Sequence, residues 1–79
     1  MDEKILETVA KVMGEWDGDG DWTGPLDEAL EALGVKAHSE QETCRREDMW
    51  ILAVIDDGRA VYVSREDLPP ADPRRYRIV

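Results

Sequence analysis

Apolar residues near the start of the chain recur at the spacing of a helix. Four of them are separated by four, three and four positions: Ile5, Val9, Val12 and Trp16. Residues at this spacing share one face of a helix. We expect Asp2 to cap this helix at its N-terminus. The glycines between Gly14 and Gly20 are expected to end it.

A second helix is predicted from the segment "TGPL" onward. Pro25 suits the first helical position, because its missing N–H would have no partner there. Gly34 is the predicted C-terminal stop, with Val35 behind it for an apolar contact. The predicted buried face consists of four residues: Leu26, Ala29, Leu30 and Leu33.

The periodicity changes in the second half of the chain. The segment "MWILAVI" (49–55) is apolar on both alternating faces, as is typical of a central strand covered on both sides. Asp57-Gly58 predicts a two-residue hairpin turn that leads into a partner strand, "AVYVS" (60–64), whose Val61 and Val63 share a face. Short edge strands are expected at 35–39 and in the final "YRIV". The predicted class is α+β, with two N-terminal helices packed on a small antiparallel sheet of three to four strands with a central hairpin.

Length and composition indicate one small domain that spans residues 1–79, with a modest core. The longest apolar run, at 49–55, is far shorter than the roughly 20 residues of a membrane span. The start of the chain has acids where a signal peptide has bases. Cys44 is the single cysteine, so it closes no internal disulfide and is expected to be a buried or idle thiol. These features predict a cytoplasmic protein.

Charge is distributed unevenly along the chain. The net charge is −9, with 19 acids and 10 bases. Residues 1–34 hold ten acids and two bases, whereas residues 35–79 hold nine acids and eight bases. Because phosphate binding needs Lys and Arg, the acidic half argues against nucleic acid or an anionic membrane as its direct ligand. It favours a basic protein surface, a cation, or solubility alone.

Motifs for catalysis are missing from the sequence. The chain has one histidine, which forms neither a Ser-His-Asp trio nor a metal-spaced His/Cys set, and it has no Gly-rich phosphate loop with its lysine. Paired carboxylates carry little information in so acidic a chain. We therefore expect function by binding, with no enzyme activity and no cofactor.

The segment "DGDGDWTGPLDE" (17–28) partly matches a calcium loop. Four carboxylates fall at ligand positions one, three, five and twelve: Asp17, Asp19, Asp21 and Glu28. However, Trp22 stands at position six, where the sharp turn needs glycine, and Pro25 at position nine has no ligand oxygen. Counting from Asp19 instead puts Gly24 at position six but loses the closing carboxylate, because Leu30 falls at position twelve. A solvated turn is favoured over a degenerate EF-hand-like calcium-binding module.

The three tryptophans have different sequence contexts. Trp16 ends the apolar stripe and Trp50 opens the central strand, so both are expected in the core. Trp22 lies inside the acidic segment 17–28, which we call the acidic loop, and has no apolar partner at helical spacing. It either packs back over the core or is an aromatic anchor among carboxylates, as expected of an interface that faces Lys or Arg.

An acidic, single-domain chain without a catalytic motif resembles the small anti-CRISPR proteins of phages and mobile elements. The resemblance is one of type, covers the whole chain and involves no signature motif. It implies that carboxylates stand in for DNA phosphates and block the nucleic-acid-binding surface of a CRISPR surveillance complex. It also implies that the protein acts in the cytoplasm of a bacterial host cell. The predicted partner-binding residues are Glu15, Asp17, Asp19, Asp21, Trp22, Asp27, Glu28 and Glu31.

Two further interpretations fit the same acidic composition. An immunity protein or antitoxin covers a basic toxin site with acids, and an acidic accessory protein has no inhibitory role.

The basic tail, with Arg74, Arg75 and Arg77, is expected to pair with the protein's own acids and dock the last strand. Alternatively, it meets the acidic loop of a second copy, so the chain is expected to be a monomer or a weak homodimer.

Overall fold

The computed structural model describes residues 1–40, 45–46, 49–64 and 66–79. Two helices come first and a sheet follows. In chain order the elements are α1 (Asp2–Glu15), α2 (Thr23–Ala32), β1 (Ala37–Ser39), β2 (Arg45–Arg46), β3 (Met49–Ile55), β4 (Ala60–Ser64), the 3₁₀ helix η1 (Pro73–Arg75) and β5 (Tyr76–Ile78). The predicted α+β class with N-terminal helices is confirmed.

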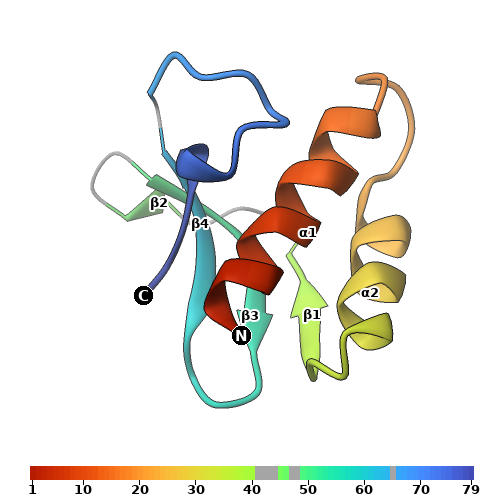
Figure 1. Cartoon of the computed structure of the whole chain (residues 1–79), viewed down its shortest axis with the longest axis vertical. Helices are drawn as coiled ribbons and strands as arrows, with labels where there is room; N and C mark the ends of the chain where they lie inside the picture. Colours follow the sequence, from red (N-terminus) through yellow and green to blue (C-terminus); the bar gives the residue numbers. More distant parts are fainter. Residues whose placement is uncertain (41–44, 47–48, 65) are drawn as a thin grey trace.

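All strands pair antiparallel, in the order β1-β3-β4-β5, and β2 also pairs with β3. The apolar β3 is therefore the central strand, as predicted, and it forms a hairpin with β4. With the two-residue β2 the sheet counts five strands. Both helices lie side by side on one face of this sheet (Figure 1). The second face of β3 is therefore not covered by a helix, and Val54 on that face is only half-buried.

The core lies between the two helices and the sheet. The predicted helical stripes are confirmed where the helices cross the sheet: Ile5 and Val9 of α1, and Leu26 and Leu30 of α2, are at most 1% exposed. Val61 of β4 is fully buried, and Val63 packs against the same cluster. The remaining sheet residues in this core are Leu52, Ala53, Ile55 and Tyr76.

Helix α2 ends as its sequence predicts. Gly34 adopts φ = 79°, a left-handed conformation that glycine takes without steric cost. The Gly34 N–H donates to Glu31 O at 2.9 Å and the Val35 N–H to Leu30 O at 3.1 Å, which together close a Schellman motif. Pro25, however, is the third residue of the helix, not the first. Its missing N–H still costs no bond, because the first helical N–H groups have no intrahelical acceptor.

The predicted start of α1 needs correction, whereas its predicted end is confirmed, because the helix ends at Glu15, between Gly14 and Gly18. Asp2 is not the cap, since the N-cap is Met1 and makes no side-chain capping bond. The Asp2 carboxylate instead accepts hydrogen bonds from Arg59 Nη1 at 3.0 Å, which ties the helix start to the β3–β4 turn. Gly14 lies in the last turn of the helix. A Cβ there would stand 2.6 Å from Ala71 Cβ, so Gly14 allows α1 to pack closely against the loop before η1.

The hairpin turn is longer than predicted. The Ile55 N–H donates to Arg59 O at 2.8 Å and the Gly58 N–H to Ile55 O at 2.9 Å, so the turn includes Asp56 as well as Asp57-Gly58. A three-residue loop of this kind is the next commonest after the two-residue one. The predicted edge strands are confirmed as β1 and β5, at opposite edges of the sheet.

Cys44, expected to be a buried or idle thiol, lies outside the described residues. Neither α1 nor α2, which are the α-helices of the described part of the chain, is long and apolar enough to cross a membrane.

Candidate partner-binding groove

A groove of about 610 Å³ lies between the C-terminal end of α1 and the first turns of α2. Trp16 and Trp22 line it, and three carboxylates line it with them. The complete lining consists of Val12, Glu15, Trp16, Asp17, Trp22, Pro25, Glu28 and Ala29. We call this feature the acidic groove. It brings two aromatic rings and three acids to one place, and none of its lining residues is basic.

Trp16 belongs to the groove and not to the core. The sequence stripe places it on the buried face, but α1 ends one residue earlier, at Glu15. Trp16 is the C-cap, with extended backbone angles (φ −70°, ψ 129°), and its side chain is 37% exposed. Its indole Nε1–H donates to Asp19 O at 3.2 Å. The prediction of a core position was therefore wrong, because periodicity holds only while the helix continues.

The other two tryptophans differ from Trp16 and from each other. Trp22 is half-buried, packs against the core cluster and also lines the acidic groove, so it combines the two interpretations of the sequence. Trp50 is 37% exposed at the start of β3, so its predicted core position was also wrong. The buried residues of β3 are Leu52, Ala53 and Ile55, in the second half of the strand.

Two aspartates of the acidic loop hold the loop itself. Asp17 Oδ1 accepts the Asp19 N–H at 2.9 Å. Asp21 Oδ1 accepts both the Thr23 hydroxyl, at 2.6 Å, and the Thr23 N–H, at 2.9 Å. These bonds, that of the hydroxyl foremost, stabilise the charged carboxylate and lower the pKa of Asp21. Asp21 therefore prepares the start of α2, where a side-chain acceptor satisfies an otherwise unpaired N–H.

The structure divides the eight predicted partner-binding residues into three groups. Glu15, Asp17, Trp22 and Glu28 come together in the acidic groove, while Asp19 and Asp21 belong to the loop beside it. The remaining two, Asp27 and Glu31, line a different cavity, of about 500 Å³, next to β1.

Asp27 has a structural role in addition. Its Oδ1 accepts the Ser39 N–H at 2.8 Å, which joins α2 to β1 and satisfies a backbone donor at the edge of the sheet.

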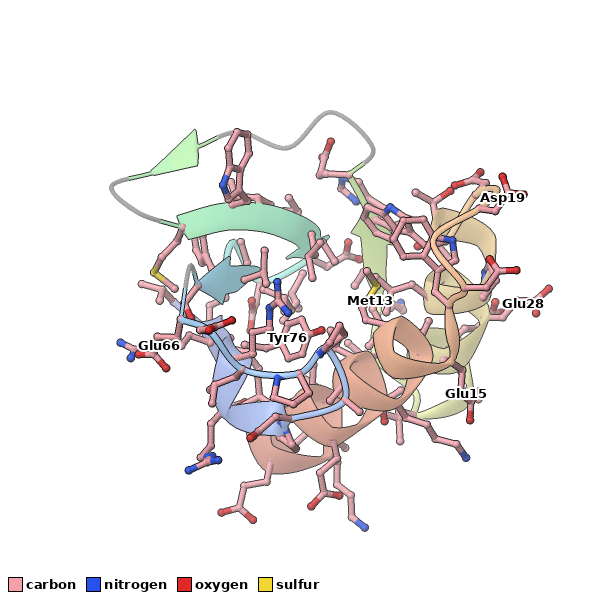
Figure 2. The ribbon with its side chains drawn as sticks, turned by 90° about the horizontal axis from the view of Figure 1, so that it is seen from above. Met13, Glu15, Asp19, Glu28, Glu66 and Tyr76 are labelled. Carbon is pink, nitrogen blue, oxygen red and sulfur yellow. The ribbon has the colours of Figure 1, made fainter. Side chains whose placement is uncertain are left out.

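The side chains of Glu15, Asp19 and Glu28 lie on the same side of the molecule, away from Glu66 and Tyr76 (Figure 2). These three carboxylates, like that of Glu31, take part in no side-chain hydrogen bond within the described chain and are therefore freely presented.

The ion pairs of the molecule lie elsewhere. In the part of the chain that the structure describes, they join Arg59 to Asp2 and Asp57, and also join the following pairs: Arg74 to Asp72, Arg77 to Glu66, and His38 to Glu40. No carboxylate between residues 15 and 31 takes part in any of them. The acids of this segment are thus not held in ion pairs with described bases and contribute a negative potential to the surface.

The basic tail docks on its own chain, as expected. Arg74 Nη2 lies 2.7 Å from Asp72 Oδ2, and this contact lowers the pKa of Asp72. Arg77 Nη2 lies 3.4 Å from Glu66 Oε1. Between them Tyr76 is buried, and its hydroxyl donates to Pro70 O at 2.6 Å. The acids that pair with these arginines, Asp72 and Glu66, do not belong to the acidic loop.

The loop does not have the geometry of the calcium site that its spacing suggests. Helix α2 begins at Thr23, so the second half of the twelve-residue segment is already helical. Asp17 and Asp21 direct carboxylate oxygens at backbone N–H groups. Among the residues described here, no three side chains of Asp, Glu, His or Cys are grouped closely enough to hold a metal ion.

Comparison with protein-family models, with curated proteins and with solved structures finds no match to this chain.

Proposed function

We propose that this protein is a non-enzymatic inhibitor that covers the basic, nucleic-acid-binding surface of another protein. The resemblance to anti-CRISPR proteins suggests a CRISPR surveillance complex as that partner. The observation that carries the proposal is that Glu15, Asp19 and Glu28 lie on one side of the molecule (Figure 2), and that no carboxylate at 15–31 forms an ion pair with a described base. Such a one-signed surface attracts Lys and Arg at long range and presents the charge that a DNA backbone would present.

The mode of binding follows from this charge. Attraction between oppositely charged surfaces mainly speeds association, and salt screens it over about 8 Å at physiological ionic strength. Inhibition should therefore weaken as salt is raised. A basic nuclease toxin offers similar chemistry to an acidic partner, so an immunity protein is an alternative outcome of the same test.

The test measures binding of target DNA to purified CRISPR surveillance complexes of different types, by fluorescence anisotropy, as the protein is added. The informative variant is Glu15→Lys/Asp19→Lys/Glu28→Lys, because these side chains make no described hydrogen bond and their reversal leaves the loop intact. Asp17 and Asp21 are left unchanged because they hold the loop. We expect the wild type to displace DNA, and the variant to need about tenfold more protein at low salt.

The matched control is Glu3→Lys/Glu7→Lys/Asp67→Lys, which changes the net charge by the same amount at exposed acids outside 15–31. It should inhibit nearly as well as the wild type. Equal loss in both triple variants would show that only net charge matters and would contradict the assigned surface. If the protein displaces DNA from none of the complexes but inhibits a basic nuclease toxin, its partner is the toxin and not a CRISPR complex.

A further inference from the structure

The acidic groove has a lining that selects strongly among ligands. Its three carboxylates repel an anion, and a neutral apolar ligand would cover them without giving them a partner, which is costly. A small inorganic cation would leave the two tryptophans without a role. The ligand that satisfies both parts of the lining is a cation with an apolar or planar body.

The two tryptophans favour a cation that lies against a ring. The only polar atom of the Trp16 ring is already used, since its Nε1–H donates to Asp19 O. Trp16 is therefore left with ring carbon atoms for contacts in the groove, and Trp22 lines the same groove. An indole attracts a cation over its face more strongly than the ring of Tyr or Phe does.

We infer that the acidic groove binds one arginine side chain of the partner. This inference rests on the proposed function, which supplies the basic partner. A guanidinium is planar, stacks on aromatic rings, is weakly hydrated, and has five N–H donors that suit carboxylates such as Glu15 and Glu28. An ammonium group is a more strongly hydrated point charge and gains less from a ring. The groove volume of about 610 Å³ accommodates the side chain together with neighbouring atoms of its segment.

An arginine of the chain itself lines the adjoining cavity. This cavity, of about 410 Å³, shares Trp16 and Asp17 with the acidic groove and includes Arg75 in its lining. The Arg75 Nη1 group donates to Leu68 O at 2.8 Å. The acidic groove thus has Trp16 and Asp17 in common with a cavity that contains an arginine, but has no base of its own.

A direct test uses small probes in place of the partner. N-acetylarginine methylamide, the matching lysine derivative and the uncharged citrulline derivative are titrated at low salt into ¹⁵N-labelled protein, and the three indole N–H signals are followed. We expect saturable shifts at Trp16 and Trp22 but not at Trp50, with about threefold weaker binding of the lysine probe and no binding of the citrulline probe.

A pair of matched variants separates the groove from the general negative potential. Glu28→Gln and Glu31→Gln each remove one exposed carboxylate from α2, but only Glu28 lines the acidic groove. We expect Glu28→Gln to weaken the arginine probe about threefold and Glu31→Gln to have a clearly smaller effect. Equal weakening by the two variants, absence of shifts at Trp16 and Trp22, or equal binding of all three probes would overturn the inference.

Failure of this inference can be told from failure of the proposed function. If the arginine probe does not bind but the protein displaces DNA from its partner, the interface is real and does not use the groove. If the probe binds with the expected selectivity but no partner is inhibited, the groove is an arginine site and the inhibitory role is wrong.

Discussion

The acidic segment at 15–31 and the tail at 66–79 are both rich in charge, but they use it differently. In the tail, Arg74 and Arg77 each contact an acid of the same segment, and the buried Tyr76 anchors the strand between them. In the acidic segment, no described base contacts a carboxylate. Charges that are paired within the chain contribute to the fold, whereas unpaired charges of one sign repel one another and are a cost to it. The difference indicates which surface is available to a partner.

Three of the four aspartates within 15–31 also make contacts within the chain. Asp17, Asp21 and Asp27 accept backbone N–H groups of the loop, of α2 and of β1. Aspartate reaches nearby backbone readily, which is why it is common at turns and helix starts. The longer Glu15 and Glu28 make no such described bond and line the acidic groove. These three aspartates stabilise the fold, whereas the carboxylates of Asp19 and of the glutamates in this segment have no described hydrogen-bond partner.

The largest expected effect comes from breaking the anchor of the tail. Tyr76 is 3% exposed, so Tyr76→Ala removes a large buried side chain and should lower the free energy of unfolding by about 3–5 kcal/mol. Tyr76→Phe keeps the ring and loses only the bond to Pro70 O, at a cost of about 1 kcal/mol. Urea unfolding followed by circular dichroism measures both. Glu28→Ala in the acidic segment should leave the urea midpoint nearly unchanged. A large loss of stability in this variant would contradict the contrast between the tail and the acidic segment.

A smaller effect is expected from pH. The pKa of Asp21 in the folded state lies below its ordinary value of 3.8 because of the bonds from Thr23. The stabilisation is therefore fully present above about pH 4 and is lost as the pH falls through the folded pKa. Asp21→Ala should lower the melting temperature at neutral pH and flatten its decline in acid. Asp19→Ala, whose side chain accepts no described bond, is the control, and identical pH profiles for both variants would contradict this role of Asp21.

The sequence predicts the elements of this fold better than the edges of those elements. Helical spacing identifies Ile5, Val9, Leu26 and Leu30 as core, because burial follows the period as long as the helix continues. It fails at Trp16, because one change of backbone angle at the helix end redirects the side chain. The acidic groove depends on that change and on the packing of α1 beside α2. Neither is encoded in local periodicity, so the sequence predicted the acids and Trp22 but missed Trp16 as their neighbour.

The smallest expected effect is that of calcium. A calcium loop needs six to eight oxygens around one ion, whereas here Asp17 and Asp21 direct oxygens at backbone N–H groups, and Glu28 lies on α2. Reorganising this loop would break the bonds that start α2. We therefore expect no saturable change in tryptophan fluorescence or melting temperature up to millimolar calcium. Trp16 and Trp22 line the groove next to the loop and make this measurement sensitive. A midpoint in the micromolar range that Glu28→Gln abolishes would instead show that the acidic segment is a metal site, and its carboxylates without a described ion pair would then need no protein partner to explain them.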